Sequence, residues 1–381
     1  MKKRFKNKRF IIFLLLIAIV LFVAYYVTNE GMRSFINRNI LKNELTENNI
    51  KAIEINSEDN PNIFAYSRYI GVFSKNDLKI YDSSSINIKT LNIPISKPII
   101  ATEEEYLLIA EKEGKSLYLV KGANIIWKNE IDDTITKISV NENGYVSIIA
   151  KNNTYKSIVY VYKPDGTQLF KKYLSSTLAV STDISKNNEF LLIGEVDYSG
   201  IAVKSGVEVI SIELAIKEPQ NSTQKRYEAL QGKILIDAKY TDNNSIVAMY
   251  DNSIIRYSKE DEETNLLEIK TDNIFVDIGL QNHITSLQKE SSGMFSFKYK
   301  VNIKNEESKK ESIYVLNSGI PKKVITNKNI IGMNFGTEVK IINTNGWLLK
   351  EYKSSKQIKD IILGTSIAGI VYKDKIEIIN F

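Results

Sequence analysis

Residues 134–174 read TITKISVNENGYVSIIAKNNTYKSIVYVYKPDGTQLFKKYL, and this stretch decides the fold. Apolar and polar side chains alternate along it with the period of half-buried β-strands. Two turn dipeptides, Asn143-Gly144 and Asp165-Gly166, supply the positive φ that tight hairpins need. The stretch therefore predicts four short strands that pair as consecutive hairpins, at 135–140, 145–150, 157–162 and 167–173.

The same pattern recurs along the chain with a period of about 40 residues. Repeats of four strands at this period are typical of β-propeller blades. Residues 49–381 are therefore predicted to form an all-β propeller of eight four-stranded blades. A seven-bladed ring is the alternative, because the strand at 322–326 is weak. The eight units begin near residues 62, 97, 134, 177, 233, 273, 321 and 357.

The last unit contains only three evident strands, which leaves its fourth strand to be supplied from elsewhere. Residues 50–56 at the start of the domain alternate, with Ile53 and Ile55 on one side. We expect this segment to pair with the strand that carries Ile376 and Ile378. That pairing closes the ring and removes an exposed strand edge.

The N-terminus predicts a membrane anchor. Phe10 to Val27 runs for 18 residues without a charge, a proline or a glycine, and a helix of this length crosses a hydrocarbon core. Bulky Tyr25 and Tyr26 at its exit favour an uncleaved signal anchor over a cleavable signal peptide. Since lysine and arginine stay on the cytoplasmic side, we expect a cytoplasmic tail at 1–9 and an extracytoplasmic C-terminal domain. The topogenic charges are Lys2, Lys3, Arg4, Lys6, Lys8 and Arg9.

Residues 28–48 are expected to form a helical stalk beside the membrane. Apolar residues such as Phe35, Ile40 and Leu45 recur there at helical spacing among polar ones. The simplest interpretation is an extension of the anchor, and a dimerisation or membrane-surface helix is the alternative.

The charge distribution argues against a nucleic-acid partner. The chain carries a net charge of +6, and all of the excess lies before Phe10. Residues 28–381 therefore hold equal numbers of basic and acidic groups, whereas a nucleic-acid-binding face needs clustered positive charge. The chain has no cysteine, so it has no disulfide, thiolate metal site or thiol nucleophile.

The sequence offers little catalytic chemistry. His283 is the only histidine, and we interpret it as a turn or blade-edge residue. No metal, cofactor or catalytic residue is predicted. Glu103-Glu104-Glu105 and Asp132-Asp133 are interpreted as solvated turns. Trp127 and Trp347 fall in outer-strand positions, where we expect them to pack one blade against the next.

The Asn-x-Asn-Gly-Tyr-Val turn at 141–146 and the Gly…Trp-Lys outer strand at 122–128 resemble WD40-like and quinoprotein-like (PQQ-like) blade repeats. The whole chain resembles an uncharacterised clostridial family of anchored propellers, a domain of unknown function (DUF5711). That resemblance implies no activity, substrate or catalytic residue.

The expected function is a non-catalytic interaction platform at the cell envelope, integral to the membrane by one span and with another envelope protein as its partner. A receptor for cell-wall glycan, peptide or a small ligand is the first alternative. A quinoprotein-like or hydrolytic enzyme is the second.

Overall fold

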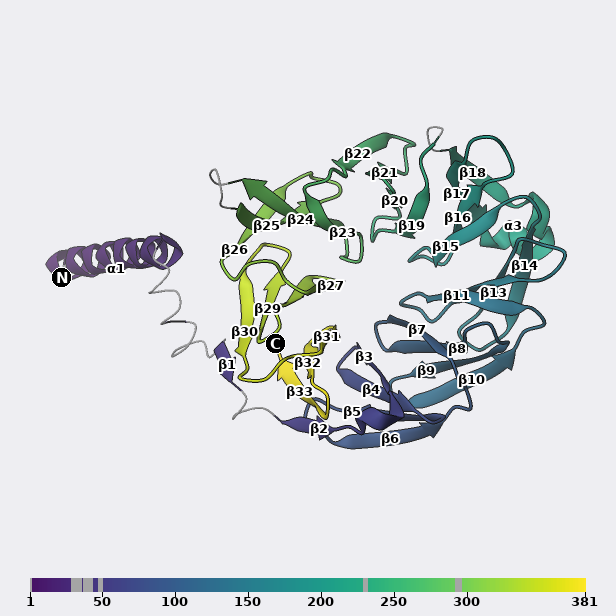
Figure 1. Ribbon diagram of the computed structural model, residues 1–381. Helices are drawn as coiled ribbons and strands as arrows, with labels where there is room; N and C mark the ends of the chain where they lie inside the picture. Colours follow the sequence, from purple (N-terminus) through teal and green to yellow (C-terminus); the bar gives the residue numbers. More distant parts are fainter. Residues whose placement is uncertain (1, 29–35, 37–43, 47–50, 229–231, 292–296) are drawn as a thin grey trace.

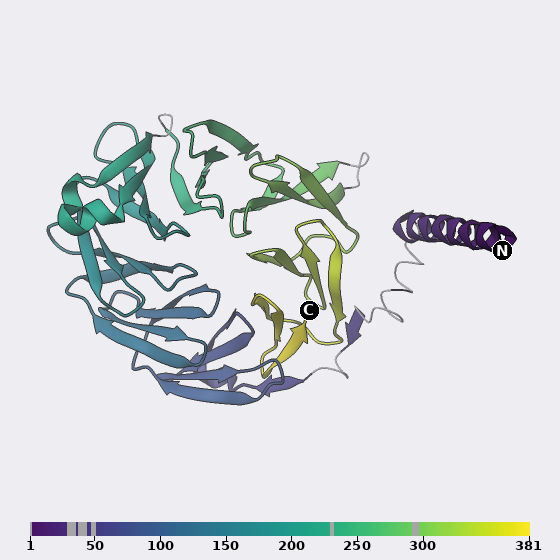
Figure 2. The same cartoon turned by 180° about the vertical axis from the view of Figure 1, so that it is seen from behind.

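The computed structural model describes residues 2–28, 36, 44–46, 51–228, 232–291 and 297–381. Eight β-sheets stand side by side in a closed ring (Figures 1 and 2). Each sheet is one blade, and we number the blades 1 to 8 from the blade that contains β3. The expected eight-bladed, all-β propeller is thus confirmed, and the seven-bladed alternative is wrong.

Within each of blades 1 to 7 the four strands follow one another along the chain, and the first strand lies nearest the centre of the ring. The first four blades are β3 (Asn62–Tyr66), β4 (Tyr69–Ser74), β5 (Asp77–Tyr81) and β6 (Asn87–Asn92); β7 (Pro98–Glu103), β8 (Tyr106–Glu111), β9 (Ser116–Lys121) and β10 (Asn124–Glu130); β11 (Thr134–Val140), β12 (Val146–Lys151), β13 (Ser157–Tyr162) and β14 (Gln168–Leu174); and β15 (Leu178–Ile184), β16 (Phe190–Asp197), β17 (Lys204–Ser211) and β18 (Thr223–Glu228).

The remaining blades have the same plan. They are β19 (Leu235–Tyr240), β20 (Ile246–Tyr250), β21 (Ser253–Tyr257) and β22 (Glu263–Glu268); β23 (Asn273–Asp277), β24 (His283–Ser291), β25 (Phe297–Asn305) and β26 (Glu311–Leu316); β27 (Lys323–Asn327), β28 (Ile330–Asn334), β29 (Glu338–Asn343) and β30 (Leu348–Lys353); and β31 (Asp360–Leu363), β32 (Ile367–Val371) and β33 (Lys375–Asn380), completed by β2 (Ala52–Glu54).

Blade 8 is built from both ends of the propeller domain. Strand β2 pairs antiparallel with β33, with Ile53 opposite Ile376. The amide of Ile55 donates to the carbonyl of Asp374 at 2.9 Å, and the amide of Ile378 donates to the carbonyl of Lys51 at 3.1 Å. Ile53, Ile376 and Ile378 are buried in one apolar cluster, against which Ile55 packs. The ring is therefore closed by hydrogen bonds and by apolar burial together.

Blade 7 has a fifth strand that the sequence did not predict. Strand β1 (Glu44–Thr46) lies parallel to β30 at the outer edge, with Leu45 opposite Tyr352. The helical stalk expected over 28–48 is therefore wrong at 44–46, because the unpaired edge of β30 offers backbone partners that a helix cannot use. Apart from Thr28, which ends the first helix, and Ile36, the rest of that stalk lies outside the described residues.

The first helix, α1 (Lys2–Thr28), lies outside the ring and contains the segment Phe10–Val27 for which we expected a membrane span (Figure 1). No helix among the described residues is long and apolar enough to cross a membrane. The other helical segments are short: η2 (Ser57–Asp59) before blade 1, and α3 (Ile212–Lys217) with η3 (Pro219–Asn221) in blade 4.

The core lies between neighbouring blades, and the hairpin glycines help to build it. Gly144 has a φ of +82°, and a Cβ there would lie 2.5 Å from the ring of Tyr106 in blade 2. Gly166 has a φ of +86°, and a Cβ there would lie 2.8 Å from Trp127. Each glycine thus permits both the turn and the close approach of an aromatic ring from the preceding blade.

Candidate functional site

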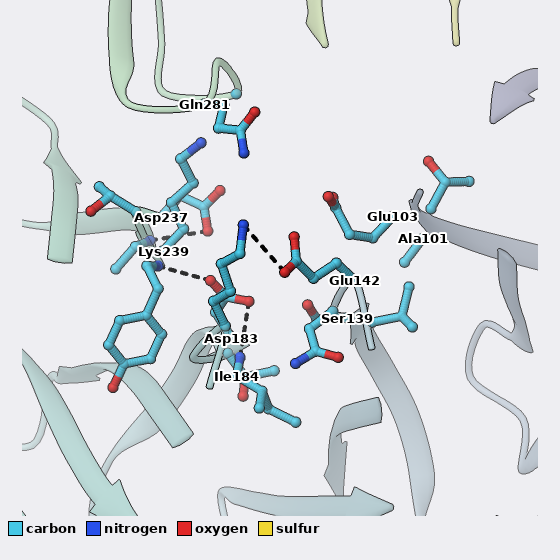
Figure 3. Close-up of a pocket in the computed structure, with 18 of the residues that line it drawn as sticks. Ala101, Glu103, Ser139, Glu142, Asp183, Ile184, Asp237, Lys239 and Gln281 are labelled. Atoms are coloured by element: carbon cyan, nitrogen blue, oxygen red, sulfur yellow. Dashed lines mark hydrogen bonds and ion pairs between the residues drawn. The ribbon is translucent and has the colours of Figure 1, made fainter. Parts of the chain in front are cut away.

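A cavity of about 330 Å³ lies at the centre of the ring. Its wall comes from the innermost strands of blades 2 to 5 and from residues that follow the innermost strands of blades 6 and 7. Nine of the lining side chains are acidic or basic, and they come from five of these blades. They are Glu103, Lys137, Glu142, Asp183, Lys186, Asp237, Lys239, Asp242 and Lys328. Figure 3 shows Asp237 and Lys239 on one side of the cavity and Glu103 and Glu142 on the other, with Asp183 between them.

A shared β-bulge aims these polar side chains. The register of the innermost strand shifts at corresponding places in four consecutive blades. The shifts lie between Ile135 and Lys137, between Ala179 and Ser181, between Leu235 and Asp237, and between Asn273 and Phe275. A bulge re-aims the side chains that follow it. The residues that lie two positions after these shifts are Ser139, Asp183, Lys239 and Asp277. They therefore occupy equivalent positions in blades 3, 4, 5 and 6.

Two lysines link blades 3 and 5: Lys137 of blade 3 reaches past blade 4, and Lys186 of blade 4 contacts both of its neighbours. The Nζ of Lys137 lies 3.3 Å from Asp237 and donates to the carbonyl of Val180 at 2.9 Å. The Nζ of Lys186 lies 3.3 Å from Glu142 and 3.5 Å from Asp242. Asp242 also accepts from Gln281 at 2.7 Å. Burial opposes ionisation of Asp242, but these hydrogen bonds and the nearby Lys186 outweigh it, so its pKa is lowered.

Lys328 joins two blades that are not neighbours in the ring. It lies between β27 and β28 of blade 7, and its Nζ is 3.1 Å from Glu103 of blade 2 and also pairs with Glu104. Burial lowers the pKa of Lys328, but the two carboxylates outweigh this effect and raise it. The pairs cross the ring on the side of blades 8 and 1, which contribute no residue to the cavity wall.

Asp183 and Lys239 have polar contacts of a different kind. Asp183 accepts from the backbone amides of Tyr240 at 2.8 Å and Ile184 at 2.9 Å. Lys239 donates to the carbonyl of Leu280 at 2.7 Å. Burial raises the pKa of Asp183 to about 7, and burial also lowers the pKa of Lys239. Both pKa shifts favour the uncharged form of the side chain. This direction is expected where the loss of hydration outweighs the attraction to neighbouring charges.

A second charged cluster lies inside blade 4. Glu195 and Glu208 are buried side by side, with Lys172 at 3.4 Å from Glu208 and Arg226 at 3.1 Å from Glu195. Burial, followed by the hydrogen bond with Glu208, raises the pKa of Glu195 to about 7. Both carboxylates are almost fully covered, so this pair is not placed to meet a substrate.

The single histidine has no catalytic partner in the described structure. The Nδ1 of His283 lies 2.8 Å from the carbonyl of Gln281, and its Nε2 lies 3.4 Å from the side-chain amide of Asn305. Its place at the start of β24 is that of the blade-edge residue we expected. Among the described residues, no group of three or more His, Asp or Glu side chains is arranged to hold a metal ion.

The two tryptophans have different roles. Trp127 is 8% exposed, stacks on Tyr162 of blade 3 and donates from Nε1 to the carbonyl of Pro164 at 3.0 Å. It docks one blade on the next, as expected. Trp347 is 67% exposed, so the same expectation is wrong for it. Trp347 directly follows Gly346 at the turn, whereas Trp127 lies five residues beyond Gly122, past the bulge of β10.

The sequence-predicted residues and the cavity are distinct parts of the molecule. Ile53, Ile55, Ile376 and Ile378 lie at the closure in blade 8, and the topogenic lysines and arginines lie within α1. The cavity residues were missed, and Glu103 and Glu104 were interpreted as a solvated turn. The available signal was positional, since polar residues at the end of the first strand of successive units converge on the centre of a propeller.

Comparisons with known proteins agree with this architecture. Residues 42–381 match the model of a family described as "Family of unknown function (DUF5711)". A comparison with curated proteins gave no match. Among solved structures, Sqt1 from Chaetomium thermophilum is 11% identical, with a TM-score of 0.52 over 87% of this chain and 98% of that one. BamB from Moraxella catarrhalis is 10% identical, with a TM-score of 0.51 over 87% of this chain and 99% of that one. At these identities the likeness shows the propeller fold alone.

Proposed function

Because the chain belongs to the family of unknown function DUF5711, we propose a function from its own residues: a membrane-anchored, extracytoplasmic propeller that acts as a non-catalytic interaction platform for another envelope protein. The support for the anchor is the sequence. Eighteen uncharged residues at Phe10–Val27 follow six basic ones, and the rest of the chain is electrically neutral.

An exposed apolar patch on the rim of the ring carries the proposal. Ile313 and Val315 alternate on β26, the outermost strand of blade 6, and each is 52% exposed. A Cβ on Gly346 would lie 3.2 Å from the carbonyl oxygen of Ile313, so the turn that carries Trp347 contacts the same strand. Tryptophan is enriched among the residues that dominate protein–protein binding energy, and an exposed apolar patch favours an interaction site.

The proposal that the protein is non-catalytic rests on the contacts of the side chains that could act as acids, bases or nucleophiles. His283 has neighbours for both ring nitrogens, and Glu195 and Glu208 are buried against Lys172 and Arg226. Four of the five cavity carboxylates, Glu103, Glu142, Asp237 and Asp242, are each paired with a lysine, and the fifth, Asp183, accepts hydrogen bonds from two backbone amides.

Cross-linking in intact cells tests the platform. Full-length protein is cross-linked, purified and analysed for co-purified envelope proteins, in the wild type and in a Trp347→Ser, Ile313→Ser variant. We expect the wild type to capture at least one protein, and we expect the captured amount of that protein to be lower by about tenfold or more in the variant. The reason is that truncation of a central aromatic anchor removes roughly 2 kcal/mol or more of binding free energy.

The matched control is Ile86→Ser in blade 1, since Ile86 is 60% exposed and lies outside the patch. Capture by this variant is expected to equal the wild type. A set of captured proteins that is the same for all three forms contradicts the assignment of the rim patch.

A further inference from the structure

The charges of the central cavity do not all compensate one another. Of the nine charged side chains in its wall, seven form ion pairs among themselves, through Lys137, Lys186 and Lys328. The other two are Asp183 and Lys239. Neither has an ion-pair partner among the residues that the structure describes. Within the described residues, the cavity therefore presents one carboxylate and one ammonium group that lie beyond ion-pair distance of any opposite charge, although they attract each other at longer range and Asp277 also attracts Lys239.

These two groups face the same level of the cavity. They occupy equivalent positions after the bulge in β15 and in β19, which are innermost strands of adjacent blades. Their polar contacts are with the backbone: two amides for Asp183 and one carbonyl for Lys239. Carboxylates and ammonium groups are strongly hydrated, so unpaired ones in a confined cavity lose solvation without an equivalent gain.

We propose that the central cavity binds a small zwitterionic molecule, whose ammonium group pairs with Asp183 and whose carboxylate pairs with Lys239. A molecule with both charges compensates both side chains at once, whereas a singly charged molecule leaves one of them unpaired. The chemical class is that of a free amino acid or a short peptide. The volume of about 330 Å³ lies at the small end of the range of ligand cavities and suits a ligand of that size.

Lys328 lines one side of this cavity. Its pairs with Glu103 and Glu104 cross from blade 7 to blade 2, and the two carboxylates remain accessible to solvent. Ion pairs of this kind contribute little net stability.

Binding measurements on the full-length protein in detergent micelles test the proposal. The probes are the twenty free L-amino acids and L-alanyl-L-alanine at millimolar concentration. We expect at least one of them to bind. Its N-acetyl derivative, which keeps only the negative charge, and its amide, which keeps only the positive charge, are each expected to bind at least tenfold more weakly.

Three variants locate the bound zwitterion. Asp183→Asn and Lys239→Gln each remove one charge and keep a polar side chain, and each is expected to weaken binding at least tenfold. Lys323→Gln is the control, because Lys323 pairs with Asp360 at 2.6 Å outside the cavity and its loss leaves binding unchanged. Circular dichroism and the melting temperature establish that each variant is folded.

Three results would overturn the proposal. The first is the absence of binding by every zwitterionic probe. The second is equal affinity for a zwitterion and its singly charged derivatives, or affinity that both cavity variants retain. The third comes from maltose, an uncharged disaccharide measured at the same concentration: tighter binding of maltose than of any amino acid or dipeptide would assign the cavity to glycan. The rim patch plays no part in these measurements, so the platform proposal stands or falls separately.

Discussion

Ile53 lies directly opposite Ile376 in the pair of strands that joins the two ends of the propeller domain. Both side chains are buried, although they are more than 300 residues apart in the chain. A blade that is assembled from both ends makes the stability of the whole ring depend on a strand of three residues, β2.

Removal of β2 is therefore expected to destabilise the propeller strongly. A chain that begins at residue 49 keeps β2, and a chain that begins at residue 58 lacks it. Loss of the buried Ile53 and the half-buried Ile55 removes about 1.5–3 kcal/mol for each aliphatic side chain that is fully buried. It also leaves β33 as an unpaired edge that favours aggregation. Thermal unfolding of the two chains measures the difference, and equal melting temperatures would contradict this account of the closure.

The orientation that we propose predicts a simple protease pattern. Protease added to intact protoplasts should degrade the domain beyond residue 28 and leave a short N-terminal fragment protected, because the six basic residues before Phe10 hold the N-terminus inside. An epitope tag at each end, detected by immunoblot, reports the outcome. Solubilisation with detergent is the control and should expose both tags. A protected C-terminal tag in intact protoplasts would reverse the orientation.

The buried ion pair in blade 4 predicts unequal effects for two adjacent lysines. Lys172 lies 3.4 Å from Glu208, and both side chains are almost fully buried. Lys172→Met leaves a buried carboxylate less compensated and is expected to lower the free energy of unfolding by about 3 kcal/mol. Lys171→Met is the matched control, because its partner Asp132 is 88% exposed and such pairs contribute about 0–1 kcal/mol. Denaturant unfolding of both variants measures the two values, and similar losses would contradict the assigned roles.

Asp183 predicts a pH dependence of stability. Its folded pKa of about 7 lies above the ordinary value of 3.8, so the folded state binds this proton more tightly than the unfolded state does. The contribution of Asp183 to the free energy of unfolding is therefore fully present below about pH 4, and it is lost as the pH rises towards about 7. The charged groups that act on Asp183 are Lys239 from β19, which lowers its pKa, and Glu103 from β7, which raises it.

Asp183→Asn keeps the shape of the side chain and removes the titration. As the pH is raised from about 4 to about 7, we expect the melting temperature of the wild type to decrease relative to that of Asp183→Asn. Glu195 titrates in both proteins and cancels in the comparison. Parallel pH profiles for the two proteins would show that Asp183 does not have a raised pKa.

Most of the fold could be predicted from the sequence because its signals are local. Alternation with period two, and the Asn-Gly and Asp-Gly turns, are properties of neighbouring residues, and they recur often enough to predict eight units and the pairing of Ile53 with the last blade. The strand at 44–46 could not be predicted in this way. Its partner, β30, is some 300 residues away, and the apolar spacing of its own segment is helical.

The sequence by itself determined the grouping of strands in fours, the segment that completes the last blade and the neutral charge of the propeller, and it left eight blades and seven as alternatives until the structure showed eight. Only the tertiary structure decided that Lys328 meets Glu103, that Asp183 and Lys239 remain without an ion-pair partner in the described part of the chain, and that Trp347 is exposed while Trp127 is buried. The physical reason is that a repeat brings equivalent positions from many blades to one centre. Which charges then compensate one another depends on distances between residues that are far apart in the chain.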